Sequence, residues 1–250
     1  MCTLILLRRP AERWPLIVAA NRDEMAGRPW RAPARHWPDR PEVVAGLDEL
    51  AGGSWLGIND HGVVAAVLNR TGSLGPAEGK RSRGELVLDA LDHADAADAA
   101  TAFGDLDASA WRSFNLVVAD SRDAFWICGL GAGRTTVTPV PDGVSMLAST
   151  DINDVVHMRI RRYLPRFRSL PAPDPESGRW GDWIGALSAR EYDRAEPDSR
   201  NAMTVVTDWG YGTVSSSLIA VPAPDGSDRR PLWLFAAGRP DDTDYTPVQL

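Results

Sequence analysis

A chain of 250 residues lies at the upper end of what one hydrophobic core supports, and its 44% of hydrophobic residues is ordinary for a folded protein. We therefore expect a single domain over residues 1–250. The formal net charge of −7 argues against a nucleic-acid partner, which would be bound through a broad basic face. Two cysteines are too few for a disulfide framework, and no apolar run is long enough for a signal peptide or a membrane span. These features predict a cytoplasmic protein without a membrane span, and they do not determine its oligomeric state.

The first third of the chain has the pattern of β-structure. Short apolar runs separated by polar turns predict two hairpins, and the second turn contains Gly62, which is suited to a positive φ. The predicted strands are Thr3–Leu7, Leu16–Ala20, Gly53–Asn59 and Val63–Asn69. The Pro- and Arg-rich stretch Arg28–Pro41 between the hairpins is expected to be a long surface connection.

Helices and further strands make up the rest of the chain. A helix is predicted from Ser82, because Ser82 and Glu85 have the spacing of a capping box and apolar residues then follow at helical intervals. The other predicted helices are Ala94–Phe103, Asp154–Arg168 and Trp180–Ala189, with a linker-like stretch at Pro171–Gly178. The other predicted strands are Phe114–Ala119, Ala124–Cys128, Thr135–Val140, Val144–Ala148, Ala202–Thr207, Thr213–Val221 and Leu232–Ala236.

This order places groups of antiparallel strands on either side of groups of helices. Such an order predicts two sheets faced by helices, an α+β fold, and not a doubly wound parallel sheet.

Cys2 follows Met1 directly, and this position could give one residue both a thiol and a free α-amine. An initiator Met is commonly removed when the next residue is small, which would leave a free α-amine on the residue that also carries the thiol. Such an amine has a pKa of about 7.7–8.0 and can act as the base for its own thiol. The alternative is that Cys2 is a small apolar residue that begins a strand.

Charged residues follow the second predicted strand. The sequence Ala-Asn-Arg-Asp-Glu at residues 20–24 places them beside the start of the first strand. Asp23 is expected to hold the α-amine or the thiol of Cys2, and Arg22 to attract an anionic substrate group or to lower the pKa of the thiol. The alternative is a solvated turn with a local ion pair.

Asn69 ends the strand that is predicted at Val63–Asn69. The amide N–H of an Asn is a suitable donor to the oxyanion that forms during acyl transfer. The alternative is that Asn69 simply terminates the strand.

Together these segments resemble the NRDE family, also called the transport-and-Golgi-organisation 2 family. The likeness is strong over residues 1–91 and collinear to about residue 221. The matching motifs are Met1-Cys2, residues 20–24, Arg28-Pro29, Trp37, Gly46-Leu47-Asp48, residues 52–57 (Gly-Gly-Ser-Trp-Leu-Gly), Leu68-Asn69 and residues 82–86 (Ser-Arg-Gly-Glu-Leu).

The resemblance implies the N-terminal-nucleophile hydrolase fold, a four-layer αββα sandwich of two antiparallel sheets flanked by helices. This fold is shared with the cysteine hydrolases that cleave penicillin V and conjugated bile salts. The resemblance further implies that Cys2 is the nucleophile, Asp23 its orienting carboxylate and Asn69 an oxyanion donor. The substrate-binding residues that it implies are Asn21, Arg22, Arg28 and Trp55. It implies no cofactor.

The chain departs from these relatives at three positions. Ala20 stands where the related hydrolases carry Arg, and Thr150 where they carry Asn. Val214 stands where the family carries Arg. Each change removes a group that would recognise an anion or stabilise charge in the transition state.

Other patterns predict structure. The run Gly129–Gly133 lacks the spacing of a dinucleotide-binding loop and is expected to form a hairpin loop, and Cys128 is expected in the core. No metal site is predicted, because the histidines are dispersed without the spacing of ligands. They are His36, His61, His93 and His157.

Three functions remain open at this point. The first is a cysteine amidohydrolase in which Cys2 attacks a non-peptide C–N bond of a small acylated molecule. The second is a non-catalytic binding or trafficking protein of the same fold that handles haem or a lipid-like ligand. The third is a scaffold of this fold with no ligand. A small molecule is the expected partner in the first two.

Overall fold

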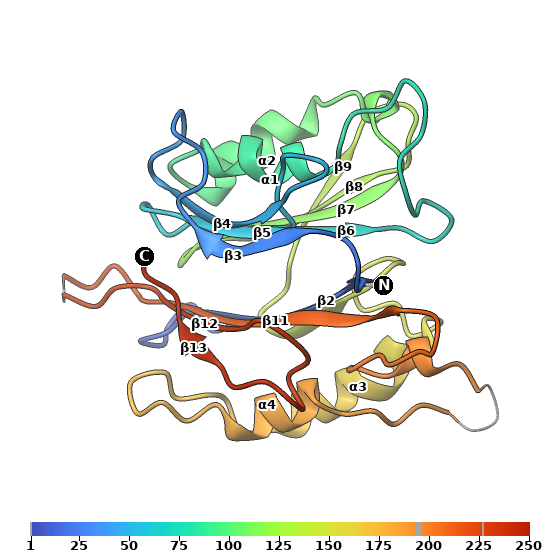
Figure 1. The fold of residues 1–250 in the computed structure, drawn as a ribbon. Coiled ribbons are helices and arrows are strands. Elements are labelled where there is room, and N and C mark those ends of the chain that lie inside the picture. Colours follow the sequence, from blue (N-terminus) through green and yellow to red (C-terminus); the bar gives the residue numbers. More distant parts are fainter. Residues whose placement is uncertain (1, 194–196, 227) are drawn as a thin grey trace. The chain divides into compact units, whose positions relative to one another are not determined.

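The computed structural model describes residues 2–193, 197–226 and 228–250. Contacts within the chain divide it into two compact units. The first comprises Met1–Arg28, Pro141–Pro222 and Gly226–Gln249. The second comprises Pro29–Val140, Ala223–Asp225 and Leu250. Each unit is built around one antiparallel sheet (Figure 1). The single domain over residues 1–250 stays a prediction.

The first unit contains a six-stranded sheet in the order β10-β1-β2-β11-β12-β13. Its strands are β1 (Thr3–Arg8), β2 (Leu16–Met25), β10 (Gly143–Leu147), β11 (Tyr211–Val221), β12 (Leu232–Ala236) and β13 (Thr246–Pro247). Its helices are α3 (Met158–Ser169), α4 (Gly181–Leu187) and the 3-10 turn η2 (Ser199–Asn201). Helix α3 packs against β10 and α4 against β2, so both helices cover one face of this sheet (Figure 1).

The core of the first unit follows from two periodicities. Side chains alternate across the faces of a strand, and the apolar ones on the helical side of β1 and β2 are fully buried. The buried residues of α3 recur three and four positions apart, which gives the helix one apolar stripe. The residues that meet in this core include Ile5, Ile17, Ala19, Ile160, Tyr163, Leu164 and Phe167.

The second unit contains a seven-stranded sheet in the order β3-β4-β5-β6-β7-β8-β9. Its strands are β3 (Trp30–Ala34), β4 (Val43–Asp48), β5 (Leu56–Asn59), β6 (Val64–Asn69), β7 (Phe114–Ala119), β8 (Ala124–Gly129) and β9 (Thr136–Pro139). Its helices are α1 (Gly84–Leu91), α2 (Ala96–Gly104) and the 3-10 turn η1 (Ala108–Ala110). Helix α1 packs against β5 and β6, and α2 packs against β8.

Gly53 and Gly84, which belong to the family motifs, allow two backbone segments of the second unit to lie in close contact. A Cβ atom placed on Gly53 would lie 2.5 Å from the carbonyl carbon of Gly84, which is closer than real Cβ contacts allow. Gly84 is the first residue of α1, and Gly53 precedes β5. The turn before β5 can therefore reach the start of α1 only because neither residue has a side chain.

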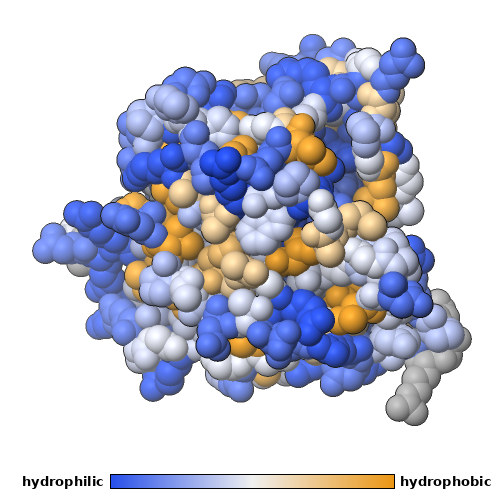
Figure 2. All heavy atoms as spheres, in the orientation of Figure 1, coloured by the Kyte–Doolittle hydropathy of each residue, from blue (hydrophilic) through white to orange (hydrophobic). Residues whose placement is uncertain are grey.

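The predicted α+β class with two antiparallel sheets is confirmed. Most of the predicted strands form, and the expected turn before β6 has Gly62 at a φ of 83°. Cys128 is buried in β8, as expected. Most of the surface visible in Figure 2 is hydrophilic, with smaller hydrophobic areas between. Within the described residues, no helix is long and apolar enough to cross a membrane.

The expected surface connection at Arg28–Pro41 is wrong in part, because β3 forms within it and pairs with β4. β3 is the first strand in the order of the sheet and therefore lies at its edge. It contains Pro33, and its pairing register shifts between Arg31 and Ala34. Proline is tolerated in an edge strand or at a bulge, because no hydrogen bond between strands needs its missing N–H there. In the sequence, however, a proline argues against a strand, and β3 is therefore not predicted.

The strand expected at Ala202–Thr207 is also wrong. Val206 forms only an isolated bridge, with Gly212. Thr204 N donates to Ala189 O at 2.9 Å, and Val205 N donates to the Thr213 hydroxyl at 2.9 Å. Loop and side-chain acceptors therefore take up hydrogen bonds that a regular ladder would use.

All four predicted helices begin later in the structure than expected, and the reason is visible at α1 and α3. Helix α1 begins at Gly84, and the capping box is wrong: Ser82 Oγ accepts from Gly84 N at 3.2 Å, while the Glu85 carboxylate pairs with Arg81. Helix α3 begins at Met158 and not at Asp154, whose carboxylate accepts from Val156 N at 3.0 Å. In both places a polar side chain bonds to nearby backbone and favours a turn over a further helical residue.

Candidate functional site

Cys2 lies directly before β1, beside the polar end of β2. Antiparallel pairing places Thr3 opposite Asn21, while β11 pairs with the other side of β2 and places Thr213 opposite Asp23. The Cys2 thiol donates to the main-chain carbonyl of Asp23, with 3.8 Å between sulfur and oxygen. The thiol thus contacts the main chain of Asp23, and the orienting role of the Asp23 carboxylate stays a prediction. The predicted removal of Met1 concerns a residue outside those that the structure describes.

The environment of the Cys2 thiol favours its protonated form. Burial raises the pKa of the thiol above its ordinary value, and the negative charge of Asp23 raises it further. The positive charge of the chain's N-terminus, the hydrogen bond to the Asp23 main chain and the charge of Arg22 lower the pKa but do not reverse the direction. Because the thiolate is the nucleophile, Cys2 needs a base to become reactive near neutral pH.

The Asp23 carboxylate is enclosed and paired. Its Oδ2 atom lies 3.0 Å from Nη1 of Arg159, and both side chains have no exposed surface. The Thr213 hydroxyl donates to the other oxygen, Oδ1, at 2.6 Å. These contacts hold the carboxylate in place, since each of its oxygens has a partner on a different element.

Arg159 connects helix α3 to the strand that follows Cys2. Besides its ion pair with Asp23, its guanidinium donates to the Thr3 hydroxyl and to the main-chain carbonyl of Arg200. Thr3 is the residue after Cys2 in the chain. Arg159 therefore contacts both residues whose backbones position the thiol.

His157 lies two residues before Arg159, at the N-cap of α3. Burial lowers the pKa of its imidazole from 6.5 to about 4, and the charge of Arg159 acts in the same direction. The imidazole is therefore neutral at neutral pH. His157 therefore adds no charge beside the ion pair of Asp23 and Arg159 at neutral pH.

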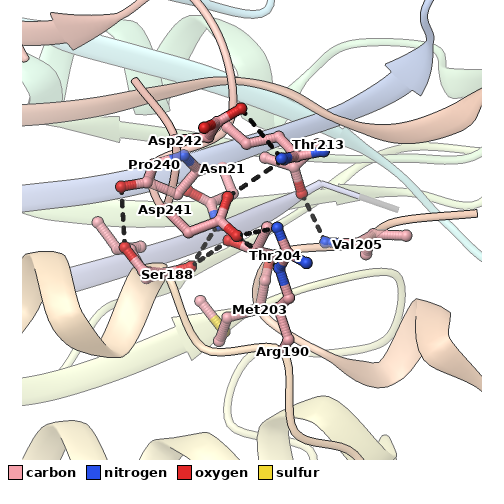
Figure 3. A network of polar contacts seen from close by, with 12 residues as sticks. Asn21, Ser188, Arg190, Met203, Thr204, Val205, Thr213, Pro240, Asp241 and Asp242 are labelled. Atoms are coloured by element: carbon pink, nitrogen blue, oxygen red, sulfur yellow. Dashed lines mark hydrogen bonds and ion pairs between the residues drawn. The ribbon is translucent and has the colours of Figure 1, made fainter. Parts of the chain in front are cut away.

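Asn21 belongs to a buried network (Figure 3). Its side-chain amide donates to Leu187 O at 3.0 Å and to Met203 O at 2.9 Å, and its side-chain oxygen accepts from the Ser216 hydroxyl at 2.6 Å. The side chain has no exposed surface. A contact of Asn21 with substrate would require these bonds to break, and its predicted substrate-binding role stays a prediction.

The same network reaches the last part of the chain (Figure 3). The Ser188 hydroxyl, at the end of α4, donates to Pro240 O at 3.0 Å. Arg190 pairs with Asp241. The loop after α4 is thereby bound to β2 through Asn21 and to Pro240 and Asp241 through side chains.

Two arginines predicted to bind substrate lie on or near β2. Arg22 is only 6% exposed, and its charge acts on the Cys2 thiol. Arg28 is partly exposed, and its Nε atom lies 3.8 Å from a Glu24 carboxylate oxygen. Arg22 is therefore close enough to influence the thiol, and the substrate contacts of both arginines stay predictions.

Asn69 and Trp55 belong to the second unit. Asn69 is the last residue of β6, is half-buried and pairs in register with Phe114 of β7. The Trp55 ring lies edge-on to Trp30, with ring centroids 5.9 Å apart. The oxyanion role of Asn69 and the substrate contact of Trp55 stay predictions.

Arg159 and Thr213 are the site residues that the sequence analysis did not identify. Arg159 lies on the buried stripe of α3, one position before Ile160 and four before Tyr163. A charged residue on an apolar helical stripe is a usable signal, because it needs a buried partner. Thr213 carries no such signal, since its contact with Asp23 depends on the register between β2 and β11. That register shifts between Thr213 and Ser215, at the bulge that contains Val214.

A groove of about 420 Å³ lies elsewhere in the first unit. Its lining includes Leu7, Val144, Arg168 and Trp183. Leu7 is near the far end of β1, roughly 17 Å from Cys2 at the rise of an extended strand. The groove is therefore not part of the Cys2 site. Among the described residues, no group of three or more His, Cys, Asp or Glu side chains is arranged to hold a metal ion.

Solved structures of hydrolases are similar to this chain over almost its whole length. An N-acylethanolamine-hydrolyzing acid amidase ortholog from Caenorhabditis elegans matches with a TM-score of 0.61 at 13% identity, covering 99% of this chain and all of the other. A variant of conjugated bile acid hydrolase from Clostridium perfringens matches with a TM-score of 0.54 at 12% identity, covering 100% of this chain and 97% of the other. Penicillin V acylase from Agrobacterium tumefaciens matches with a TM-score of 0.51 at 15% identity, covering 95% and 83%. The predicted fold of the N-terminal-nucleophile hydrolases is thereby confirmed.

Curated relatives share sequence over shorter segments. The Transport and Golgi organization protein 2 homolog of Bos taurus is 40% identical over 123 residues, which are 45% of this chain and 42% of the relative. The homolog of Homo sapiens is 34% identical over 130 residues, 46% of this chain and 43% of the relative. The matches thus span about two fifths of these relatives. The family model for Transport and Golgi organisation 2 matches residues 1–225, which is most of the chain, and the protein therefore belongs to the Transport and Golgi organisation 2 family.

Proposed function

We propose that this protein is a cysteine amidohydrolase that cleaves a non-peptide C–N bond of a small acylated molecule, with Cys2 as the nucleophile. The observation that carries the proposal is the setting of the thiol. It lies 3.8 Å from the carbonyl of Asp23, whose side chain is held by a fully buried arginine. Buried charges at a strand end are typical of sites that do chemistry.

The reaction begins when the α-amine of Cys2, exposed by removal of Met1, accepts the proton of the thiol. The thiolate attacks the carbonyl carbon of the substrate amide, and the carbonyl electrons move to oxygen. Collapse of this intermediate breaks the C–N bond, and the amine leaves with the proton from the α-ammonium group. Water then attacks the thioester, which releases a carboxylic acid and restores the thiol.

A protonated thiol needs a base before it can attack, and in this mechanism the α-amine of Cys2 supplies it. At neutral pH the thiol is protonated, so a base beside the sulfur has to remove the proton as the attack proceeds. In this mechanism Asp23 orients the amine and Asn69 donates to the oxyanion, as the resemblance to the hydrolases implies. Support for acting on an amide comes from the fold, which is shared with an amidase and an acylase of small molecules.

The test is a panel of acyl amides of a fluorogenic amine, with chain length and head group varied. Wild-type protein should release the amine, Cys2→Ala should not, and Cys128→Ala should remain active because Cys128 is a buried core residue of β8 with no part in the proposed reaction. Equal release by wild type and Cys2→Ala would contradict the proposal. Intact mass should show that Met1 is absent from active protein, and activity of a protein that retains Met1 would exclude the amine mechanism.

Non-catalytic binding of haem or a lipid-like ligand is the second candidate function. Burial raises the pKa of the Cys2 thiol and so reduces the thiolate available for catalysis, which the binding of a lipid-like ligand does not require. Absence of turnover with the whole panel, together with a Soret shift on haem titration that Cys2→Ala abolishes, would replace the hydrolase proposal with this one.

A further inference from the structure

Arg159 occupies a position where elementary electrostatics disfavours a cation. It lies in the first turn of α3, where the positive end of the helix dipole repels a positive charge. Its side chain has no exposed surface, so its charge is removed from water. An apolar residue would suit both features of this position better.

The contacts of Arg159 converge on the nucleophile. Its guanidinium neutralises Asp23 at 3.0 Å and also donates to the Thr3 hydroxyl. Asp23 supplies the carbonyl that the Cys2 thiol contacts, and Thr3 is bonded covalently to Cys2. The Arg159 side chain therefore holds two neighbours of the thiol. Thr3 is joined to Cys2 by a peptide bond, and Asp23 contacts the thiol through its main-chain carbonyl.

We propose that Arg159 is a positioning residue of the Cys2 site, which balances the charge of Asp23 and fixes Thr3 so that the thiol is held and its acidity set. This inference rests on the proposed function for its biological meaning, but it concerns the thiol itself and can be tested without a substrate. Arg159 does not contact the reacting atoms. It acts through Asp23 and Thr3.

The charge balance has a direct consequence for the thiol. The negative charge of Asp23 disfavours the thiolate, and Arg159 offsets that charge. The other charges that act on the thiol are Arg22 on β2 and the N-terminus of the chain, and His157 beside Arg159 is neutral. Removing only Arg159 leaves Asp23 unbalanced, whereas removing both charges restores the balance.

The experiment measures the rate of Cys2 alkylation by iodoacetamide between pH 6 and pH 10 on folded, full-length protein. Peptide mass spectrometry separates Cys2 from Cys128. The variants are Arg159→Gln, Arg159→Lys, and the double variant Asp23→Asn with Arg159→Gln. Arg161→Gln is the matched control, because Arg161 lies on the same helix with its side chain 52% exposed.

We expect Arg159→Gln to move the midpoint of the pH profile upward by about one unit, which is a tenfold slower alkylation below the midpoint. Arg159→Lys and the double variant should return the midpoint toward that of wild type, and Arg161→Gln should leave it unchanged. If Arg159→Gln does not fold, Asp23→Asn with Arg159 intact decides the question: a midpoint below that of the double variant supports the proposal, and equal midpoints overturn it.

An unchanged midpoint in folded Arg159→Gln would overturn the inference, even if the protein hydrolyses amides. Conversely, failure of the whole amide panel would contradict the proposed function and leave these alkylation profiles as they are. The two proposals therefore fail through different measurements.

Discussion

Both units bury polar side chains that satisfy backbone groups, and the first unit also buries an ion pair. In the second unit, buried polar side chains satisfy backbone at the ends of elements: Asn59 donates to the carbonyls of Leu91 and His93, and Asp120 accepts from Ala96 N at the start of α2. In the first unit, Asp23 and Arg159 bury opposite charges on each other. Caps are explained by folding alone, because a helix end leaves unpaired backbone groups.

A buried ion pair has no such explanation. Replacing a buried pair with apolar residues of similar size is often neutral or stabilising, because desolvation offsets the attraction. The pair in the first unit also lies beside a cysteine thiol. We therefore expect substitutions of the buried ion pair to change both the stability of the protein and the acidity of the Cys2 thiol, and substitutions of the caps in the second unit to change stability alone.

The largest expected effect comes from breaking the buried pair. Arg159→Met leaves Asp23 buried without its counter-charge and should lower the free energy of unfolding by about 3–5 kcal/mol. The matched control in the second unit is Arg35→Met, which removes an exposed ion pair with Asp60 at 2.7 Å and should cost about 0–1 kcal/mol. Denaturant unfolding measures both. Similar losses for the two variants would remove the distinction between the units.

The second effect is a dependence of stability on pH that comes from His157. Its pKa is about 4 in the folded protein and 6.5 in the unfolded chain, so between these values the unfolded state binds more protons and stability falls as pH falls. The full contribution is present above pH 6.5. At pH 5 the loss is about 2 kcal/mol relative to pH 8.

The variant His157→Gln removes this group. Its free energy of unfolding, compared with that of wild type at pH 8 and at pH 5, should improve by about 2 kcal/mol at the lower pH. A difference between the two proteins that stays constant over this range would show that the His157 ring is not buried as a neutral group.

The smallest expected effect is the loss of a helix cap in the second unit. Asp95 is the N-cap of α2, and its carboxylate accepts from Asp98 N at 2.8 Å. Asp95→Ala should lower the free energy of unfolding by about 1 kcal/mol, as the loss of a cap does. The pH profile of Cys2 alkylation should not change. A shifted profile would mean that polar groups of the second unit also set the chemistry of the thiol.

Much of the fold is predictable because its periodic patterns are local. The strands that pair around Leu16–Ala20 and Val63–Asn69, and the helices with apolar stripes, follow from alternation and helical spacing. β3 and the segment at Ala202–Thr207 are mispredicted for opposite reasons. Pro33 hides a strand that forms at an edge, and the Thr213 hydroxyl supplies an acceptor that replaces a strand partner.

The candidate site is predictable only where neighbours in the chain carry the signal. Cys2, Arg22 and Asp23 follow from position and from the polar run expected after a strand at Leu16–Ala20. That expected end is wrong, because β2 continues through the polar run to Met25 and pairs there with β11. Arg159 and Thr213 come from distant segments, and sequence does not reveal which buried carboxylate a helical arginine meets. The register shift at Val214 is likewise a property of the paired strands and not of either strand alone.

The central claim is that Cys2 is a nucleophile with a free α-amine, and intact mass spectrometry after exposure to an activated acyl probe tests it most directly. We predict a protein that lacks Met1 and gains one acyl group on Cys2, with no gain in Cys2→Ala and an unchanged gain in Cys128→Ala. Retention of Met1, or equal acylation of wild type and Cys2→Ala, would contradict the account.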